Sequence, residues 1–301
     1  MGSMIKATAL VTDNGFSAID NATRAGLDCL QQAGIQPQQV GLLINAGVYR
    51  DDNIMEPSIA SLIQRHMNMG LDFAADSPNQ VTFSFDVVNG ACGFLNAVTI
   101  ADAFLRNGSV EYALIVCGDA HPSKTDHPEF PYVAVGAAAL LHLSTAAADA
   151  NKGFGPFAYR SNESDCLSHI STYGDLAQFG DQGRAQGQFQ FSNQYVEEFR
   201  RLNVTLINEF LAQHEQPRVD FLLGSDLEAG YCNSVCASSD LKRQPTRAME
   251  LFEHFNGDPH TAAPIAAFHQ LQREVANPSG LSLLFHAVGS GDASACALYR
   301  S

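Results

Sequence analysis

The fold of this chain is decided by the stretch Phe83-Ser84-Phe85-Asp86-Val87-Val88-Asn89-Gly90-Ala91-Cys92-Gly93-Phe94-Leu95-Asn96-Ala97. Its first part predicts a buried strand and its last part predicts the start of a helix, with a turn of small residues between them. Cys92 lies at that turn, where the amides of the first helical turn and the positive end of the helix dipole stabilise a thiolate. We therefore expect its pKa to fall from ~8.5 toward neutrality. Cys92 is the candidate nucleophile, and the alternative is a small buried core residue.

The composition is that of a globular protein with a large core. The chain has 301 residues, of which 46% are hydrophobic and 16% are charged. Its formal net charge of −15 disfavours nucleic acid and anionic membranes as partners, because both attract Lys and Arg. No apolar run reaches the ~18 residues of a membrane span, and the seven cysteines fit a reducing compartment, so we expect a cytoplasmic protein.

The two halves of the sequence repeat one pattern. Helical stretches at 21–32 and 195–213 each lead through a proline-containing turn to an apolar strand, at 41–47 and 220–224. Each half then closes with a pair of strands, 112–117 with 135–143 and 281–287 with 293–299. Such self-similarity indicates a duplicated structural unit.

Short apolar strands that alternate with helices predict buried sheets covered by helices on both faces. Two stacked units of this kind make a five-layer αβαβα fold in the α/β class. The boundary is expected within 146–156, which divides the chain into an N-terminal half, 1–150, and a C-terminal half, 151–301. Residues 161–190 contain many turn signals and little periodicity, so we expect a loop that either covers a site or is a plain surface excursion.

Several stretches resemble the thiolase superfamily, and within it the type III ketoacyl-acyl-carrier-protein synthases and their acyltransferase relatives. They are Gln39-Val40-Gly41-Leu42-Leu43-Ile44, the segment 89–97 around Cys92, the strand at 112–118 and the loop Gly289-Ser290-Gly291. The segment around Cys92 is the specific part of the likeness.

The resemblance implies an enzyme that transfers an acyl group from a thioester to Cys92 and then to a second substrate, by condensation or by simple acyl transfer. The Cys92 amide and an amide of the loop that contains Gly289 and Gly291 would form an oxyanion hole, because paired backbone donors stabilise the developing negative charge. The donor would be coenzyme A or the phosphopantetheine of an acyl carrier protein, with no tightly bound cofactor and no metal. A cytoplasmic homodimer in fatty-acid-like or specialised-metabolite biosynthesis is implied as well.

The chain departs from the family pattern at the polar catalytic positions. The usual histidine position holds Ser225 or Asp226, whereas His260 lies near the usual asparagine position. We expect His260 to act as the base toward Cys92 and Asp226 to orient its ring. The competing histidines are His269 and His286, which we interpret as structural.

Two other functional classes remain open. A non-catalytic or partner-dependent subunit of a heterodimeric condensing enzyme is suggested by the missing histidine and by the short stretch before the first helix. A cysteine hydrolase would need only Cys92 and a histidine. The acyl chain, the acceptor and the length of a tunnel near Phe94, Phe189 and Phe191 are left open by the sequence.

Overall fold

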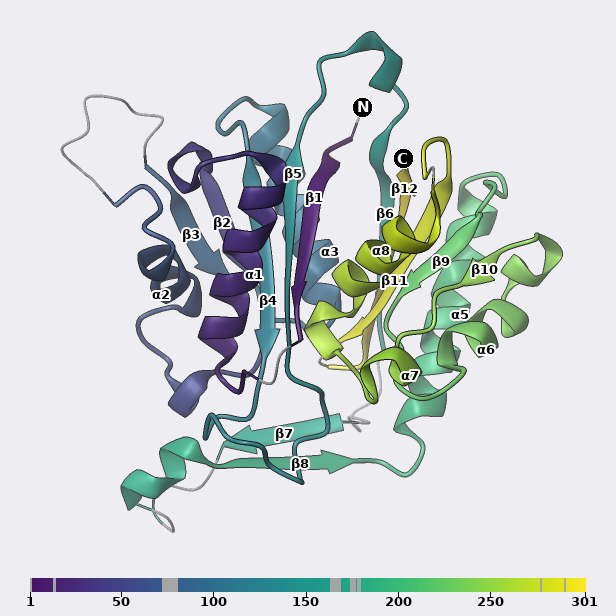
Figure 1. Cartoon of the computed structure of the whole chain (residues 1–301). Coiled ribbons are helices and arrows are strands. Elements are labelled where there is room, and N and C mark those ends of the chain that lie inside the picture. The colour runs from purple at the N-terminus through teal and green to yellow at the C-terminus, as the bar shows by residue number, and fades with distance from the viewer. Residues whose placement is uncertain are drawn as a thin grey trace.

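The first half of the chain builds a five-stranded mixed sheet with the order β1-β5-β4-β2-β3 (Figure 1). β2 runs parallel to both β3 and β4, whereas β5 is antiparallel to β1 and to β4. The chain is described by a computed structural model that covers residues 2–12, 15–71, 81–162, 169–173, 177, 180–276, 278–289 and 291–301. The strands are β1 (Met4–Val11), β2 (Leu42–Asn45), β3 (Phe83–Asp86), β4 (Ala113–Asp119) and β5 (Val135–His142).

The second half repeats this arrangement in the order β6-β12-β11-β9-β10. β9 is parallel to β10 and β11, and β12 is antiparallel to β6 and β11, so each strand has a counterpart in the first sheet. The expected division after residue 150 falls between β5 and β6, where the chain leaves one sheet for the other. The strands are β6 (Gly153–Ser161), β9 (Phe221–Gly224), β10 (Arg247–Ala248), β11 (Ser282–Gly289) and β12 (Ala293–Arg300).

Helices complete five layers and confirm the predicted αβαβα architecture. α3 and α8 share one hydrophobic core with the inner faces of both sheets. α1 and α2 pack on the outer face of the first sheet, and α5 and α6 pack on the outer face of the second. The helices are α1 (Ala18–Ala33), α2 (Ile59–His66), α3 (Cys92–Arg106), α5 (Tyr195–Gln213), α6 (Tyr231–Ser238), α7 (Phe252–Phe255) and α8 (Ala263–Glu274).

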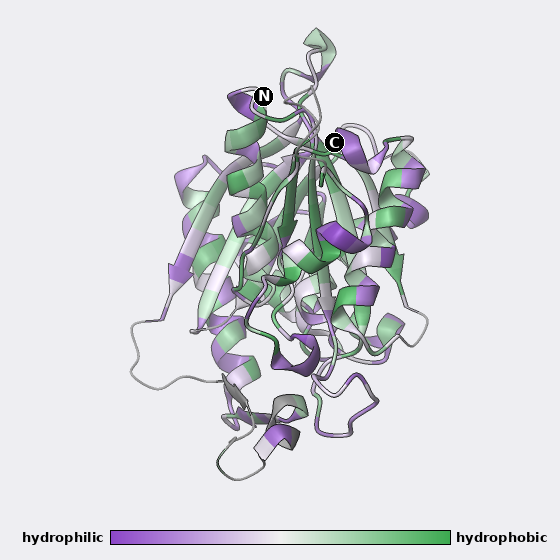
Figure 2. Cartoon of the chain, turned by 90° about the vertical axis from the view of Figure 1, so that its left-hand side faces the viewer, coloured by the Kyte–Doolittle hydropathy of each residue, from purple (hydrophilic) through white to green (hydrophobic). Residues whose placement is uncertain are grey.

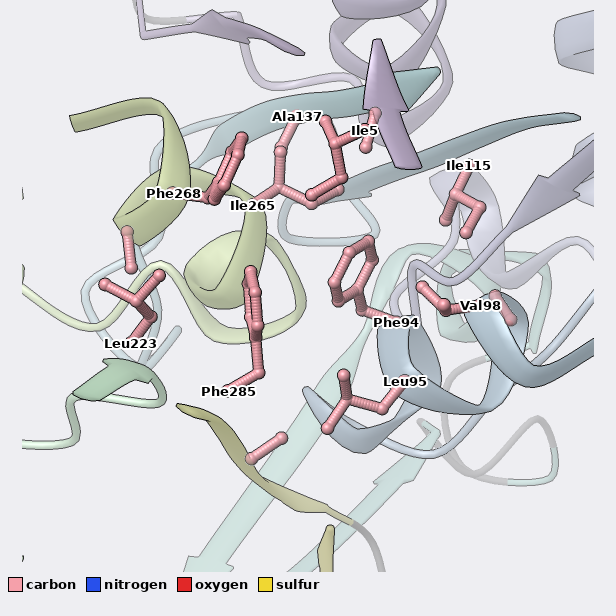
Figure 3. Close-up of a cluster of buried hydrophobic side chains, with 14 of the residues drawn as sticks. Ile5, Phe94, Leu95, Val98, Ile115, Ala137, Leu223, Ile265, Phe268 and Phe285 are labelled. Carbon is pink, nitrogen blue, oxygen red and sulfur yellow. The ribbon is translucent and has the colours of Figure 1, made fainter. Parts of the chain in front are cut away.

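The central core holds the start of α3 against the second sheet (Figure 3). The ring centroids of Phe94 on α3 and Phe285 on β11 are 6.0 Å apart, and Phe268 on α8 lies 6.0 Å from Phe285. All three side chains are buried. Hydrophobic residues follow the strands, while hydrophilic residues mark the outer helices and loops (Figure 2). The strand-to-helix turn before α3 is thereby fixed at the junction of the two halves.

The stretch 161–190 was expected to be a loop, and this expectation is wrong in part. β7 (His169–Tyr173) pairs antiparallel with β8 (Gly187–Phe191), and a 3₁₀ helix at Gly180–Ala185 precedes β8. Figure 1 shows this hairpin crossing beneath both sheets, at the end where β4 finishes. Residues 163–168, 174–176 and 178–179 of the stretch lie outside the described residues.

Candidate functional site

A pocket lies at the strand-to-helix turn between the two halves. Its apolar and aromatic lining suits a hydrocarbon chain, and besides two tyrosines the polar side chains on its wall come from Ser225, Asp258 and His260. Its cavity volume is about 40 Å³. The remaining lining residues are Ala91, Pro131, Tyr132, Phe191, Tyr195, Phe199, Leu227, Val288 and Gly289.

The residue of the turn that lines this pocket is Ala91. Gly90 adopts a positive φ of 51°, which favours glycine, and the Ala91 amide donates to the Val288 carbonyl at 3.1 Å. This hydrogen bond ties the turn to β11 of the other half. Ala91, and not Cys92, is therefore among the residues that line the pocket.

The structure places Cys92 one residue further on, as the first residue of α3 and only 1% exposed. Its Sγ lies 3.8 Å from the Ala293 carbonyl oxygen, and burial raises the pKa of this thiol. The expectation of a lowered pKa is therefore wrong, because the loss of hydration outweighs the helix amides and dipole. The acyl-accepting role of Cys92 stays a prediction.

His260 does line the pocket, from a short 3₁₀ helix, His260–Ala262, that precedes α8. Its Nδ1 lies 2.8 Å from Oδ2 of Asp119, and its ring stacks on Tyr132 with centroids 4.0 Å apart. Asp119 is 1% exposed, at the end of β4. Although burial acts to raise it, the pKa of the Asp119 carboxyl is lowered by the neighbouring His260 ring and by hydrogen bonds from His260, Thr261 and the Tyr49 amide.

Asp226 does not orient His260, which corrects the sequence-based assignment. Its carboxylate accepts hydrogen bonds from the amides of Cys232, at 3.3 Å, Leu251, at 2.6 Å, and Phe252, at 2.8 Å. Asp226 is fully buried, and burial raises its pKa. It therefore joins the loop after β9 to α6 and α7.

The two glycines of the C-terminal loop differ in position. Gly289 lines the pocket, and a Cβ there would lie 2.2 Å from the carbonyl oxygen of Asn89. Gly291, with a φ of 68°, lies in the turn between β11 and β12, where a Cβ would contact nothing within 4 Å. Close packing thus requires glycine at 289, and backbone conformation favours it at 291. The oxyanion role of either amide stays a prediction, and Ser290 lies outside the described residues.

Asp258 is a site residue that the sequence analysis missed. It lines the pocket, is 6% exposed, and accepts a hydrogen bond from the His260 amide at 2.7 Å. Burial raises the pKa of Asp258 to about 6. Asp119 was also missed. Its position directly after the apolar strand 112–118 could have indicated a site residue, because polar residues at the carboxyl ends of strands often face a site.

The competing histidines, His286 and His269, make structural contacts away from the pocket. His286 is fully buried, with Nδ1 3.0 Å from Nδ2 of Asn203 and Nε2 3.3 Å from Sγ of Cys232, and burial lowers its pKa to about 3. The Nδ1 of His269 lies 3.0 Å from the hydroxyl of Thr8. Of the tunnel candidates, Phe191 lines the pocket, whereas Phe94 belongs to the central core.

In the part of the chain that the structure describes, no group of three or more His, Cys, Asp or Glu side chains is placed to hold a metal ion. Over the same residues, no helix combines the length and the apolar character that a membrane span requires.

Curated sequence relatives match only part of the chain, and no protein-family model matches it. An acyl-CoA:acyl-CoA alkyltransferase of Xanthomonas campestris pv. campestris is 36% identical over 107 residues, which are 36% of this chain and 28% of that protein. A β-ketoacyl-[acyl-carrier-protein] synthase III of Coxiella burnetii is 36% identical over 104 residues, covering 34% and 28%. Each matched segment is therefore less than a third of the relative's length.

Solved structures match the whole chain. A crystal structure of Xanthomonas campestris OleA superposes with a TM-score of 0.76 at 18% identity, covering 100% of this chain and 99% of that one. The synthase FabH from Pseudomonas aeruginosa PAO1 gives a TM-score of 0.77 at 13% identity, covering 100% and 98%. The chain therefore shares its fold with OleA and with 3-oxoacyl-(acyl carrier protein) synthase III, as the resemblance implied.

Proposed function

We propose that this chain is an acyltransferase of the type III ketosynthase kind, which receives an acyl group from a thioester and passes it to a second substrate. The observation that supports this most is the pocket at the strand-to-helix turn, where an apolar, acyl-compatible lining meets His260 and the Gly289 backbone. The partial match to an acyl-CoA:acyl-CoA alkyltransferase points to the same substrate chemistry.

The acyl donor in this proposal is an acyl-coenzyme A or an acyl carrier protein. The synthase III relatives are named for a carrier protein and the alkyltransferase for acyl-CoA, and the pocket wall suits the acyl part common to both. A cytoplasmic dimer in fatty-acid-like or specialised-metabolite biosynthesis belongs to the proposal. A heterodimer with a second condensing subunit is the other arrangement.

In this proposal Cys92 accepts the acyl group, for which its sulfur has to turn away from the Ala293 carbonyl toward the wall that Ala91 now forms. The test is intact-protein mass spectrometry after incubation with acyl-coenzyme A thioesters from acetyl to palmitoyl. We expect one added acyl mass on the wild type and on Cys236→Ala, which removes a half-buried thiol elsewhere. We expect none on Cys92→Ala.

A second candidate is a non-catalytic or partner-dependent subunit of a heterodimeric condensing enzyme. Ala91 lines the pocket, whereas Cys92 is 1% exposed and burial raises its pKa. This candidate predicts no acyl adduct on the wild type across the same thioesters, together with binding of the acyl-CoA, measured by calorimetry. An adduct on Cys92 would refute it.

A further inference from the structure

The pocket between the two halves is small. Its cavity volume is about 40 Å³, and a single water needs ~10–15 Å³ of such space. The pocket therefore holds about three water-sized groups. The methyl group, the carbonyl carbon and the carbonyl oxygen of an acetyl group fill about this space, whereas an extended fatty acyl chain does not fit.

Part of the pocket wall is backbone that cannot give way. The Ala91 amide donates to the Val288 carbonyl at 3.1 Å, which holds the turn before α3 against β11. Next to it, a Cβ on Gly289 would lie 2.2 Å from the carbonyl oxygen of Asn89, so these two segments are already in contact. A longer acyl chain finds no space here, because it would have to break a buried backbone hydrogen bond.

Tyr132 separates the pocket from a second cavity. Its ring stacks on His260 with centroids 4.0 Å apart, and it lines both spaces. The second cavity is larger, about 490 Å³, and mainly polar, with His121, Asp126 and His127 in its lining. Burying an alkyl chain among such groups is unfavourable, because their hydrogen bonds to water are lost without replacement. This cavity therefore does not extend the acyl site.

Aromatic side chains form another part of the wall. The rings of Phe191 on β8 and Tyr195 on α5 have centroids 4.7 Å apart, and the ring of Phe199 lies 6.4 Å from that of Tyr195. Tyr195 and Phe199 are about one helical turn apart, so both reach the pocket from one face of α5. Phe199 is 5% exposed. Unlike the backbone part of the wall, these side chains can be shortened without loss of a main-chain hydrogen bond.

We infer that this pocket admits only acyl groups of about two or three carbons, and that Phe199 and Tyr195 are the residues that set this limit. The inference rests on the proposed function, because it takes the ligand to be an acyl thioester. It narrows that proposal from acyl groups in general to acetyl and propionyl groups. A methylene without space in an apolar pocket lowers reactivity about tenfold or more, so we expect a steep limit.

The experiment offers the wild type an equimolar mixture of acetyl-, propionyl-, hexanoyl- and octanoyl-coenzyme A and reads the acyl adducts from the intact-protein mass. Because the thioesters compete for one protein and share the coenzyme A part, the ratio of adducts depends on the acyl group alone. We expect acetyl and propionyl adducts to exceed the longer ones by at least about 100-fold. Phe199→Ala removes the phenyl ring and should raise the hexanoyl-to-acetyl ratio at least about tenfold.

Further variants separate the size of the pocket from the stability of the fold. Phe210 is a buried phenylalanine of the same helix that packs in the outer core instead of the pocket. Phe199→Leu should raise the hexanoyl-to-acetyl ratio, whereas the matched control Phe210→Leu should keep the wild-type ratio. Tyr195→Ala tests the neighbouring position and should raise the ratio even if Phe199→Ala fails to fold.

The outcomes distinguish this inference from the proposed function. Hexanoyl or octanoyl adducts on the wild type at the level of the acetyl adduct would overturn the inference and leave the proposed acyl transfer standing. A hexanoyl-to-acetyl ratio that stays at the wild-type value in both Phe199→Leu and Tyr195→Ala would overturn it too. The absence of any adduct, whatever the chain length, would instead overturn the proposed function, and the inference with it.

Discussion

Replacing Asp226 by alanine tests the structural role that the coordinates give this residue. The carboxylate accepts three backbone amides, of which those of Cys232 and Leu251 are buried and that of Phe252 is partly buried. A buried donor left without an acceptor costs ~1–3 kcal/mol, so three donors give ~3–9 kcal/mol. Part of this loss is offset, because removing the carboxyl also removes the cost of burying it, which is seen in its raised pKa. We expect a net loss of about 3 kcal/mol in the free energy of unfolding.

The assay is urea unfolding of the wild type, Asp226→Ala, Asp226→Asn and the exposed control Asp28→Ala. Asparagine keeps one oxygen, which can still accept the amides of Leu251 and Phe252, so we expect about half of the alanine loss. A loss below about 1 kcal/mol in Asp226→Ala would refute the reasoning.

The remaining predictions concern the pocket. Iodoacetamide should label Cys92 in the native wild type at least about tenfold more slowly than it labels the new thiol in Ala91→Cys, read by peptide mass, and equal rates would contradict the burial argument. Asp258, with its pKa raised to about 6, should make the protein lose up to about 3 kcal/mol of stability as pH rises from ~4 to ~6, because the unfolded chain releases that proton first. Urea titrations at several pH values should show this fall flattened in Asp258→Asn, and an unchanged slope would contradict it. Gly289→Ala should cost about 1–3 kcal/mol in thermal unfolding, because its Cβ meets the Asn89 oxygen, and an unchanged melting temperature would show that the turn yields freely.

The duplicated fold was predictable because its signals are local. The apolar strands at 41–47 and 220–224 correspond to β2 and β9, and the helical stretch 195–213 has the bounds of α5. β7 and β8 were not predicted because their hairpin is stabilised by contacts with residues distant in sequence. One of these is the packing of Phe189 on Tyr49, with ring centroids 5.6 Å apart. The turn-rich sequence of this stretch gives no local pattern from which such a contact could be predicted.

The site was predictable in its histidine but not in its carboxylate. His260 was chosen because it lies near the usual asparagine position, and the structure puts it on the pocket wall. Asp226 was chosen because an acidic residue commonly orients such a base, whereas the observed partner, Asp119, comes from the other half, 141 residues away. Pairing across a duplicated interface is set by how the two sheets stack, which depends on the whole central core.

The direction in which the Cys92 side chain points depends on the residue at which α3 begins, and not only on the presence of a cysteine at the turn. In a helix, successive residues are rotated by ~100°, so one position decides between the pocket and the core. Here the Ala91 amide is fixed on the Val288 carbonyl, and this hydrogen bond sets the phase in which α3 begins. The sulfur of the next residue then points to the Ala293 carbonyl of β12 instead of to His260. A turn that looks suited to a reactive thiol thus places Ala91, and not Cys92, among the residues that line the pocket.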